Sequence, residues 1–157
     1  MTILSECGAY RYTLTRVIPQ PIRWVKPILF ILLNPSTANA VIPDPTSTRC
    51  VEFAKSWGGT SLTIVNLFAL RATYPEDLLT HPDPIGPDND KHIKEQIAEH
   101  ALGKIVLGWG ANKFARSRAA DVLTLLDGRG LCLHQNKDKS PRHPLYIKGN
   151  AELKELT

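Results

Sequence analysis

The sequence has few cysteines, and none is placed for a cross-link or a metal cluster. Its 157 residues include three cysteines, Cys7, Cys50 and Cys132, which are widely spaced and form no C-x-x-C pair. This spacing gives no sign of a disulfide framework, a zinc site or an iron-sulfur cluster. We therefore expect the three thiols to be buried and to act as small hydrophobic side chains.

A long apolar run and a targeting segment are also lacking. No stretch approaches the roughly 20 apolar residues that a helix needs to cross a bilayer. The first ten residues, "MTILSECGAY", have neither the basic start nor the apolar middle of a signal peptide. We therefore expect a cytoplasmic protein with no membrane partner.

Several signatures of catalysis and cofactor binding are missing. There is no GxGxxG, Walker loop, GxSxG or HExxH. Five histidines lack the spacing of metal ligands: His81, His92, His100, His134 and His143. Four aspartates stand beside prolines or at expected helix starts, where capping explains them: Asp44, Asp83, Asp88 and Asp90. We expect neither a metal ion nor another cofactor.

Positive charge is in small excess. Lysine and arginine number 19 and aspartate and glutamate 15, for a net charge of +4. This permits a polyanionic partner but is too small to indicate one by itself. Hydrophobic residues make up 43% and charged residues 22%, which excludes disordered and fibrous classes.

What the sequence does contain is a series of apolar runs. Runs at 27–33, 62–68, 104–110 and 130–135 are nearly continuous in Ile, Leu and Val. Strands of a parallel sheet that is covered on both faces have this character. The earlier segment 10–17 alternates in polarity, which predicts an antiparallel edge strand or a hairpin.

Helical patterns occupy the intervals between these runs. Capping signals and apolar periodicity predict helices over about 47–57, 87–103 and 112–128. Because strands and helices alternate, we expect one α/β domain over 1–157, a three-layer α/β/α sandwich around a short, mostly parallel sheet.

Polar residues stand where the predicted strands end. Asn34 ends the first core strand, Asn66 lies near the end of the second, and Trp109 and Gly110 end the third. His143 follows the fourth. Ligands of such sheets bind outside the carboxyl ends of the strands, so we expect these residues to converge on one rim.

Each of these residues has a structural interpretation as well as a functional one. Asn34 fits a turn cap, or an amide that fixes a water or a ligand edge. Asn66 fits a satisfied buried amide, or one that meets a base edge. The basic loop 137–148 around His143 fits a solvated surface, or a phosphate-contacting segment. The turn at 109–112 offers backbone N–H groups to an anion.

Six motifs occur in order along the chain and together cover nearly its whole length: "LLNPSTA", "DPTSTRC", "NLFALRATYPEDL", "DPIGPDND", "GWGAN" and "PRHPLYI". This order is typical of the family called domain of unknown function 1643, and the chain is identified as a member of it. The family name implies no activity.

The layout also resembles the uracil-DNA glycosylase superfamily, which shares the expected fold. "LLNPS" resembles the Gly-Ile-Asn-Pro motif of the mismatch-specific branch, "IVNLFALRAT" resembles an Asn-containing motif of the thermophilic branch, and "RHPLYI" resembles the His-Pro loop. The resemblance implies that Asn34 positions the attacking water, Asn66 reads the base edge, and His143 stabilises the departing base. It further implies base contacts at Trp109 and Gly110.

Other roles follow from the chemistry of base release. Ser36, Lys137 and Arg142 are expected to contact phosphates, and Leu145 or Tyr146 to wedge into the base stack. The stacking aromatic is open among Phe53, Phe68 and Trp109. The chain departs from the superfamily because no acidic residue directly follows "NPS" and no Ser-Pro follows the His-Pro pair.

These observations lead to a functional hypothesis with two alternatives. We expect a glycosylase-like enzyme that hydrolyses the N-glycosidic bond of a damaged or modified base in nucleic acid, DNA rather than RNA. The alternatives are a non-catalytic binder of a nucleotide or nucleic acid, and an N-glycosidase of free modified nucleosides.

Overall fold

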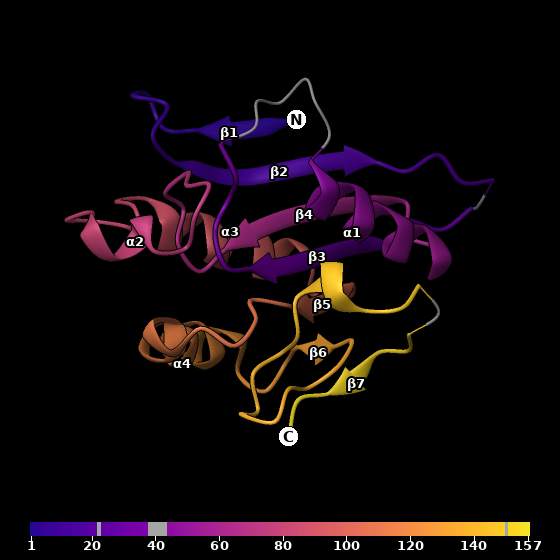
Figure 1. Ribbon diagram of the computed structural model, residues 1–157. Coiled ribbons are helices and arrows are strands. Elements are labelled where there is room, and N and C mark those ends of the chain that lie inside the picture. The colour runs from indigo at the N-terminus through magenta and orange to yellow at the C-terminus, as the bar shows by residue number, and fades with distance from the viewer. Residues whose placement is uncertain (22, 38–43, 150) are drawn as a thin grey trace.

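The computed structural model describes residues 1–21, 23–37, 44–149 and 151–157, which form a mixed α/β fold around a seven-stranded sheet (Figure 1). The strands are β1 (Thr2–Leu4), β2 (Arg11–Val17), β3 (Pro27–Leu32), β4 (Ser61–Asn66), β5 (Lys104–Leu107), β6 (Leu131–Cys132) and β7 (Lys154–Glu155). The α-helices are α1 (Pro45–Ser56), α2 (Asp77–Thr80), α3 (Asn89–Glu99) and α4 (Arg116–Leu126), and the 3₁₀ helices are η1 (Lys113–Ala115) and η2 (Pro144–Tyr146).

The sheet has a parallel centre and antiparallel edges. Its strand order is β1-β2-β4-β3-β5-β6-β7, and the two termini lie at opposite edges (Figure 1). β3 pairs in parallel with both β4 and β5, and β5 with β6. β1 and β2 form an antiparallel hairpin, β2 continues antiparallel onto β4, and β7 is antiparallel to β6.

The expectation of a short, mostly parallel sheet was therefore wrong in two respects. The sheet has seven strands, and three of its pairings are antiparallel. The short outer strands β1 and β7 carry no continuous apolar run that would predict them. The segment predicted at 10–17 is the long strand of the hairpin, with β1 outside it at the edge.

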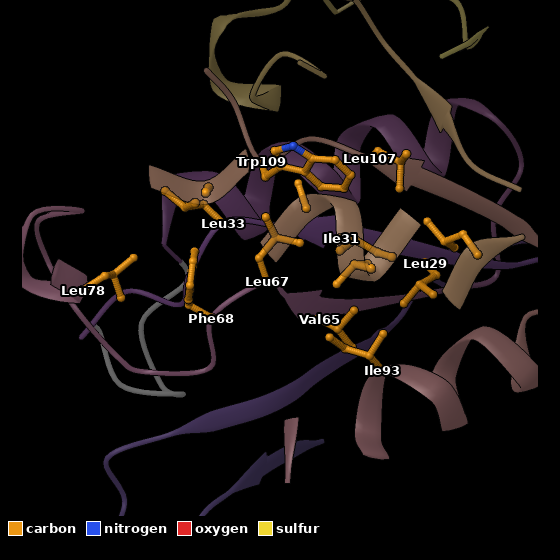
Figure 2. Close-up of a cluster of buried hydrophobic side chains, with 14 of the residues drawn as sticks. Leu29, Ile31, Leu33, Val65, Leu67, Phe68, Leu78, Ile93, Leu107 and Trp109 are labelled. Atoms are coloured by element: carbon orange, nitrogen blue, oxygen red, sulfur yellow. The ribbon is translucent and has the colours of Figure 1, made fainter. Parts of the chain in front are cut away.

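Two apolar clusters lie on opposite faces of the central strands because successive side chains of a strand point to opposite sides. Leu29, Ile31 and Leu33 pack with side chains of α3 and α4, the cluster that Figure 2 shows. Ile28, Phe30 and Leu32 pack with Cys50, Phe53 and Ala54 of α1. Helices thus cover both faces, which is why the core strands are apolar throughout.

The strands end earlier than their apolar runs suggest. β5 stops at Leu107, because the chain turns through Gly110, whose φ is +81°. β6 stops at Cys132, and beyond it the chain folds back so that Gln135 bridges Pro141. Among the cysteines, Cys50 and Cys132 are buried as predicted, whereas Cys7 is exposed because it lies in the turn between β1 and β2.

Candidate functional site

The strand order reverses between β3 and β5, and the main cleft opens there. The chain passes from β3 to β4 on one side and later returns to β5 on the other, so the carboxyl ends of β3 and β5 border a crevice. A cleft of about 650 Å³ lies at this point, within the range of small-molecule sites. Its lining includes Asn34, Ser36, Thr46, Trp109, Gly110, Asn112, Asn136, Arg142, His143, Leu145 and Tyr146.

Two hydrogen bonds from its amide nitrogen fix the side chain of Asn34. Its Nδ2 donates to the carbonyl oxygens of Pro35 and Ala72, both at 3.0 Å. Because a carbonyl oxygen only accepts hydrogen bonds, the amide nitrogen of Asn34, and not its oxygen, must face these two carbonyls. Both N–H bonds are thereby used, and Oδ1 remains as an acceptor. Asn34 is thus both the turn residue and a candidate ligand group.

His143 is held as a neutral donor. Its Nδ1 accepts from the backbone N–H of Leu145 at 3.2 Å, within the turn that begins η2. Because a backbone N–H only donates, Nδ1 is unprotonated and the ring proton sits on Nε2. Burial lowers the pKa of His143, and the nearby carboxylate of Asp44 opposes this shift. A neutral imidazole with an Nε2–H donor results.

A second, smaller cavity of about 60 Å³ adjoins the cleft, which we call the Arg11 cavity. Asn34, Ser36, Thr46 and His143 line both spaces. The remaining residues of its lining are Arg11, Leu32, Asp44, Ser47, Ile64 and Asn66. Its volume suits a small polar group or a few water molecules.

Asn66 lies in the Arg11 cavity and is absent from the lining of the main cleft. It is 2% exposed. Its backbone carbonyl accepts from Nδ2 of the buried Asn89, which fixes the end of β4. Asn34, Asn66 and His143 thus meet in one cavity, but one far smaller than the cleft.

Two charged residues of the Arg11 cavity were missed as site residues. Asp44 caps α1 as predicted, with Oδ1 accepting from the N–H of Ser47 at 2.9 Å, yet it also lines the cavity. Arg11 begins β2, whose amino end meets the carboxyl end of β4 because the two strands are antiparallel. The only local signal was an arginine at the start of an alternating strand.

The turn after β5, at residues 109–112, was expected to offer base contacts and free backbone N–H groups, and its two leading residues are placed differently. Trp109 is 4% exposed and belongs to the core cluster of Figure 2, with part of its surface on the cleft. Gly110 also lines the cleft, but its N–H donates to the carbonyl oxygen of Pro141 at 2.8 Å. That N–H is therefore not free to receive an anion.

The expected phosphate contacts and wedge residues divide between buried and exposed positions. Ser36 lines both spaces, and its buried Oγ has no partner in the described structure. Arg142 is exposed on the cleft, whereas Lys137 is exposed and lines neither space. Leu145 and Tyr146 are 42% and 70% exposed at the cleft rim.

Of the aromatic candidates for stacking on a base, only Trp109 reaches the cleft. Phe53 belongs to α1 and is buried in the apolar cluster between α1 and the sheet. Phe68 is buried in the cluster on the opposite face of the sheet. Neither lines the cleft or the Arg11 cavity.

Membrane spans and metal clusters are both absent from the described residues. No helix in the ranges that the structure describes has the length and apolar character to cross a membrane. Nor do three or more His, Cys, Asp or Glu side chains in those ranges gather as they would around a metal ion.

Comparison with known proteins identifies a family for the chain. No curated protein and no solved structure matches the chain. The family model described as Protein of unknown function (DUF1643) matches residues 11–145, a span that runs from the start of β2 into η2 and includes nearly all of the residues that line the two spaces described above. The chain belongs to the DUF1643 family.

Proposed function

We propose that the protein is a glycosylase-like hydrolase that cleaves the N-glycosidic bond of a damaged or modified base in nucleic acid. On this proposal its fold is a three-layer α/β/α sandwich of the uracil-DNA glycosylase type. The supporting observation is the pairing of Asn34 and His143 in one cleft. Asn34 presents an acceptor oxygen and His143 a neutral donor, at the carboxyl ends of the central strands.

These two groups match the charges that form in the reaction. Breaking the bond builds positive charge on the sugar and negative charge on the base. A water that donates to Oδ1 of Asn34 attacks C1′, and the electron pair of the C1′–N bond leaves with the base. The Nε2–H of His143 stabilises that negative charge by donating to it, an interaction that strengthens in the transition state. Burial lowers the pKa of His143, so the donor is neutral near pH 7.

Asp44 supplies the acid that is missing next to "NPS". Its carboxylate lines the Arg11 cavity together with Asn34 and His143. We assign it the proton that the attacking water loses, while the departing base takes a proton from solvent. Oδ1 of Asp44 is engaged by the N–H of Ser47, which orients the carboxylate.

The rim carries groups suited to a flipped nucleotide. Arg142 is exposed on the cleft and suits a backbone phosphate. Leu145 and Tyr146 are exposed beside His143, where an apolar wedge would fill the space left by an extruded base. Trp109 offers the only aromatic wall of the three predicted candidates.

The test is base release from oligonucleotides that carry uracil, mismatched or hypermodified bases. Alkaline treatment converts abasic sites into strand breaks, and free nucleosides with the same bases are assayed in parallel. We expect breaks from oligonucleotides that fall about 100-fold in Asn34→Ala and in His143→Ala. Asn112→Ala is the matched control, because Asn112 lines the same cleft and its amide makes only a 3.4 Å contact with the Trp109 carbonyl.

The outcomes separate the alternatives. Release that persists in Asn34→Ala and His143→Ala would remove these residues from the chemistry. Release from nucleosides alone would replace the nucleic-acid substrate with a small molecule.

A non-catalytic binder of nucleotides or nucleic acid is the second candidate. It is favoured by the lining of the cleft, which contains no Asp or Glu among the described residues. Binding without base release would support it. The salt dependence of binding then identifies the ligand, because several phosphate contacts give a steep slope and a small ligand a shallow one.

A further inference from the structure

Arg11 is a buried cation with no hydrogen-bond or ion-pair partner among the described residues. Its side chain is 8% exposed, and its Nε has no hydrogen-bond partner in the described structure. In the same ranges no carboxylate lies within 4.0 Å of its guanidinium, since the ion pairs found there involve other residues. Burial lowers the pKa of Arg11, and Asp44 and Arg71 act on it in opposite directions.

An unpaired buried charge is costly, which makes this arrangement informative. Proteins almost always pair buried guanidinium groups or hydrogen-bond them, because desolvation of the ion is otherwise uncompensated. Arg118 shows the usual solution in the same molecule: it is 6% exposed, donates from Nε to the Leu67 carbonyl and pairs with Asp90. Arg11 lacks both kinds of partner among the described residues and instead borders a cavity.

Further donors surround the same cavity. The buried Oγ of Ser36 has no partner among the described residues. Asn66 brings a side-chain amide to the same lining. Thr46 lies in the first turn of α1, a helix of 12 residues whose N-terminus carries partial positive charge. A guanidinium, a hydroxyl, an amide and a helix N-terminus form a set of donors that fits oxygen atoms bearing negative charge.

Asp44 limits the charge that the cavity accepts. Its carboxylate borders the same space, although the Ser47 N–H holds Oδ1. One negative charge is therefore already present beside Arg11. A doubly charged group would be repelled, whereas a singly charged one would be balanced by the guanidinium and the helix end.

We propose that the Arg11 cavity is a subsite for a singly charged oxyanion, a phosphodiester or a carboxylate, carried by the ligand that occupies the main cleft. Because Asn34, Ser36, Thr46 and His143 line both spaces, one ligand reaches both. The subsite binds its anion whether or not any bond is cleaved, so it is independent of the proposed glycosidase activity.

The test uses two probes, dimethyl phosphate and acetate, titrated as sodium salts into the full chain with sodium chloride as the ionic-strength control. The readout is the ¹⁵N–¹H signal of the Arg11 Nε–H, together with the backbone signal of Thr46. We expect saturable shifts with at least one probe and none with chloride. Dimethyl phosphate alone would indicate a phosphodiester ligand, and acetate alone a carboxylate ligand.

Three variants make the test specific. We expect Arg11→Gln to weaken binding by at least tenfold, because charge-assisted hydrogen bonds are lost. Ser36→Ala removes a hydroxyl without a described protein partner, so it should fold normally and bind roughly fivefold more weakly. Arg16→Gln is the control on the same strand, because Arg16 lines neither space and bonds only its neighbour's carbonyl among the described residues.

Two results would overturn the subsite. One is the absence of saturable shifts with both probes. The other is unchanged affinity in both Arg11→Gln and Ser36→Ala. If Arg11→Gln fails to fold, Ser36→Ala alone decides, and unchanged affinity in that variant refutes the proposal.

Discussion

The Asn34 side chain donates from Nδ2 to the carbonyl oxygen of Ala72 at 3.0 Å, and this bond joins the end of β3 to the loop that follows β4. The same nitrogen also donates to Pro35. One asparagine therefore closes its own turn and holds a neighbouring loop. Its remaining Oδ1 is oriented for a ligand as a consequence of structural bonds.

Replacing Asn34 should therefore reduce stability as well as function. Asn34→Ala removes the side-chain donor to the Ala72 carbonyl, whereas the Pro35 carbonyl still accepts from the N–H of Ala72. We expect the free energy of unfolding to fall by about 1–3 kcal/mol. Urea denaturation at pH 7 measures the change. Asn112→Ala, which removes only a 3.4 Å contact, should stay within about 0.5 kcal/mol of the parent. Equal stability of the parent, Asn34→Ala and Asn112→Ala would show that the Asn34 side chain does not hold the loop after β4 in place.

The position of His143 depends on Gly108, the residue that follows β5. A Cβ at Gly108 would lie 3.0 Å from Cδ of Pro144 and 3.1 Å from a methyl group of Leu32. Pro144 opens η2 directly after His143, so a push on its ring displaces the imidazole. We expect Gly108→Ala to cost about 1–3 kcal/mol of stability through overpacking and to shift the NMR signals of the His143 ring.

Gly128→Ala is the matched control for Gly108→Ala. Gly128 has a φ of +81°, but no atom lies within 4 Å of the place that an alanine methyl group would take, so the change adds backbone strain without a clash. We expect a loss of about 1 kcal/mol with the His143 signals unmoved. Displacement of those signals in Gly128→Ala, or their constancy in Gly108→Ala, would disprove the contact mechanism.

The central strands could be predicted from sequence because their burial is nearly complete. Leu29, Phe30 and Ile31 are 0% exposed, and strands covered on both faces require unbroken apolar runs. The convergence of Asn34 and His143 on one rim likewise followed from a general rule for the carboxyl ends of parallel strands. Both features follow from the local composition of the strands and from the alternation of strands and helices, which is compatible with few topologies.

Arg11 and Asp44 could not be assigned to the site by the same reasoning. The position of Arg11 depends on β2 pairing with β4, and although the alternation of β2 indicates an antiparallel strand, it does not indicate which strand is its partner. Asp44 has a sufficient local explanation as the cap of α1, so nothing in its neighbourhood indicates His143 as a spatial neighbour. Long-range pairing, rather than residue type, decides both.

Stability should decline on mild acidification because of His100. This residue is 3% exposed at the end of α3, and burial lowers its pKa in the folded state. The unfolded chain, with an ordinary pKa of about 6.5, then binds a proton more readily than the folded one. The contribution of His100 is therefore fully present above that value and is lost as pH falls below it.

Urea denaturation between pH 7.5 and 5 tests this dependence. His143, whose pKa is also lowered, adds a loss of the same sign. We therefore expect the free energy of unfolding to fall less steeply with acidification in His143→Ala and in His100→Gln than in the parent protein, because each variant removes one of the two contributions. A stability that is constant over this range in the parent protein would contradict both shifts.

Asp44→Asn separates the charge of Asp44 from its role as a cap. Asparagine caps helices about as well as aspartate, so α1 should keep its start and stability should change by less than about 0.5 kcal/mol. The carboxylate raises the pKa of His143 against the effect of burial. Without it, the NMR titration midpoint of the His143 ring should move below its value in the parent protein.

Base release should also fall in Asp44→Asn, because the attacking water loses its proton acceptor, whereas neutral His143 keeps its donor at pH 7. Asp138→Asn, which changes an exposed carboxylate outside both spaces, should leave the midpoint unchanged. A His143 midpoint that does not move in Asp44→Asn would show that the two side chains are electrostatically independent, and Asp44 would then be a helix cap alone.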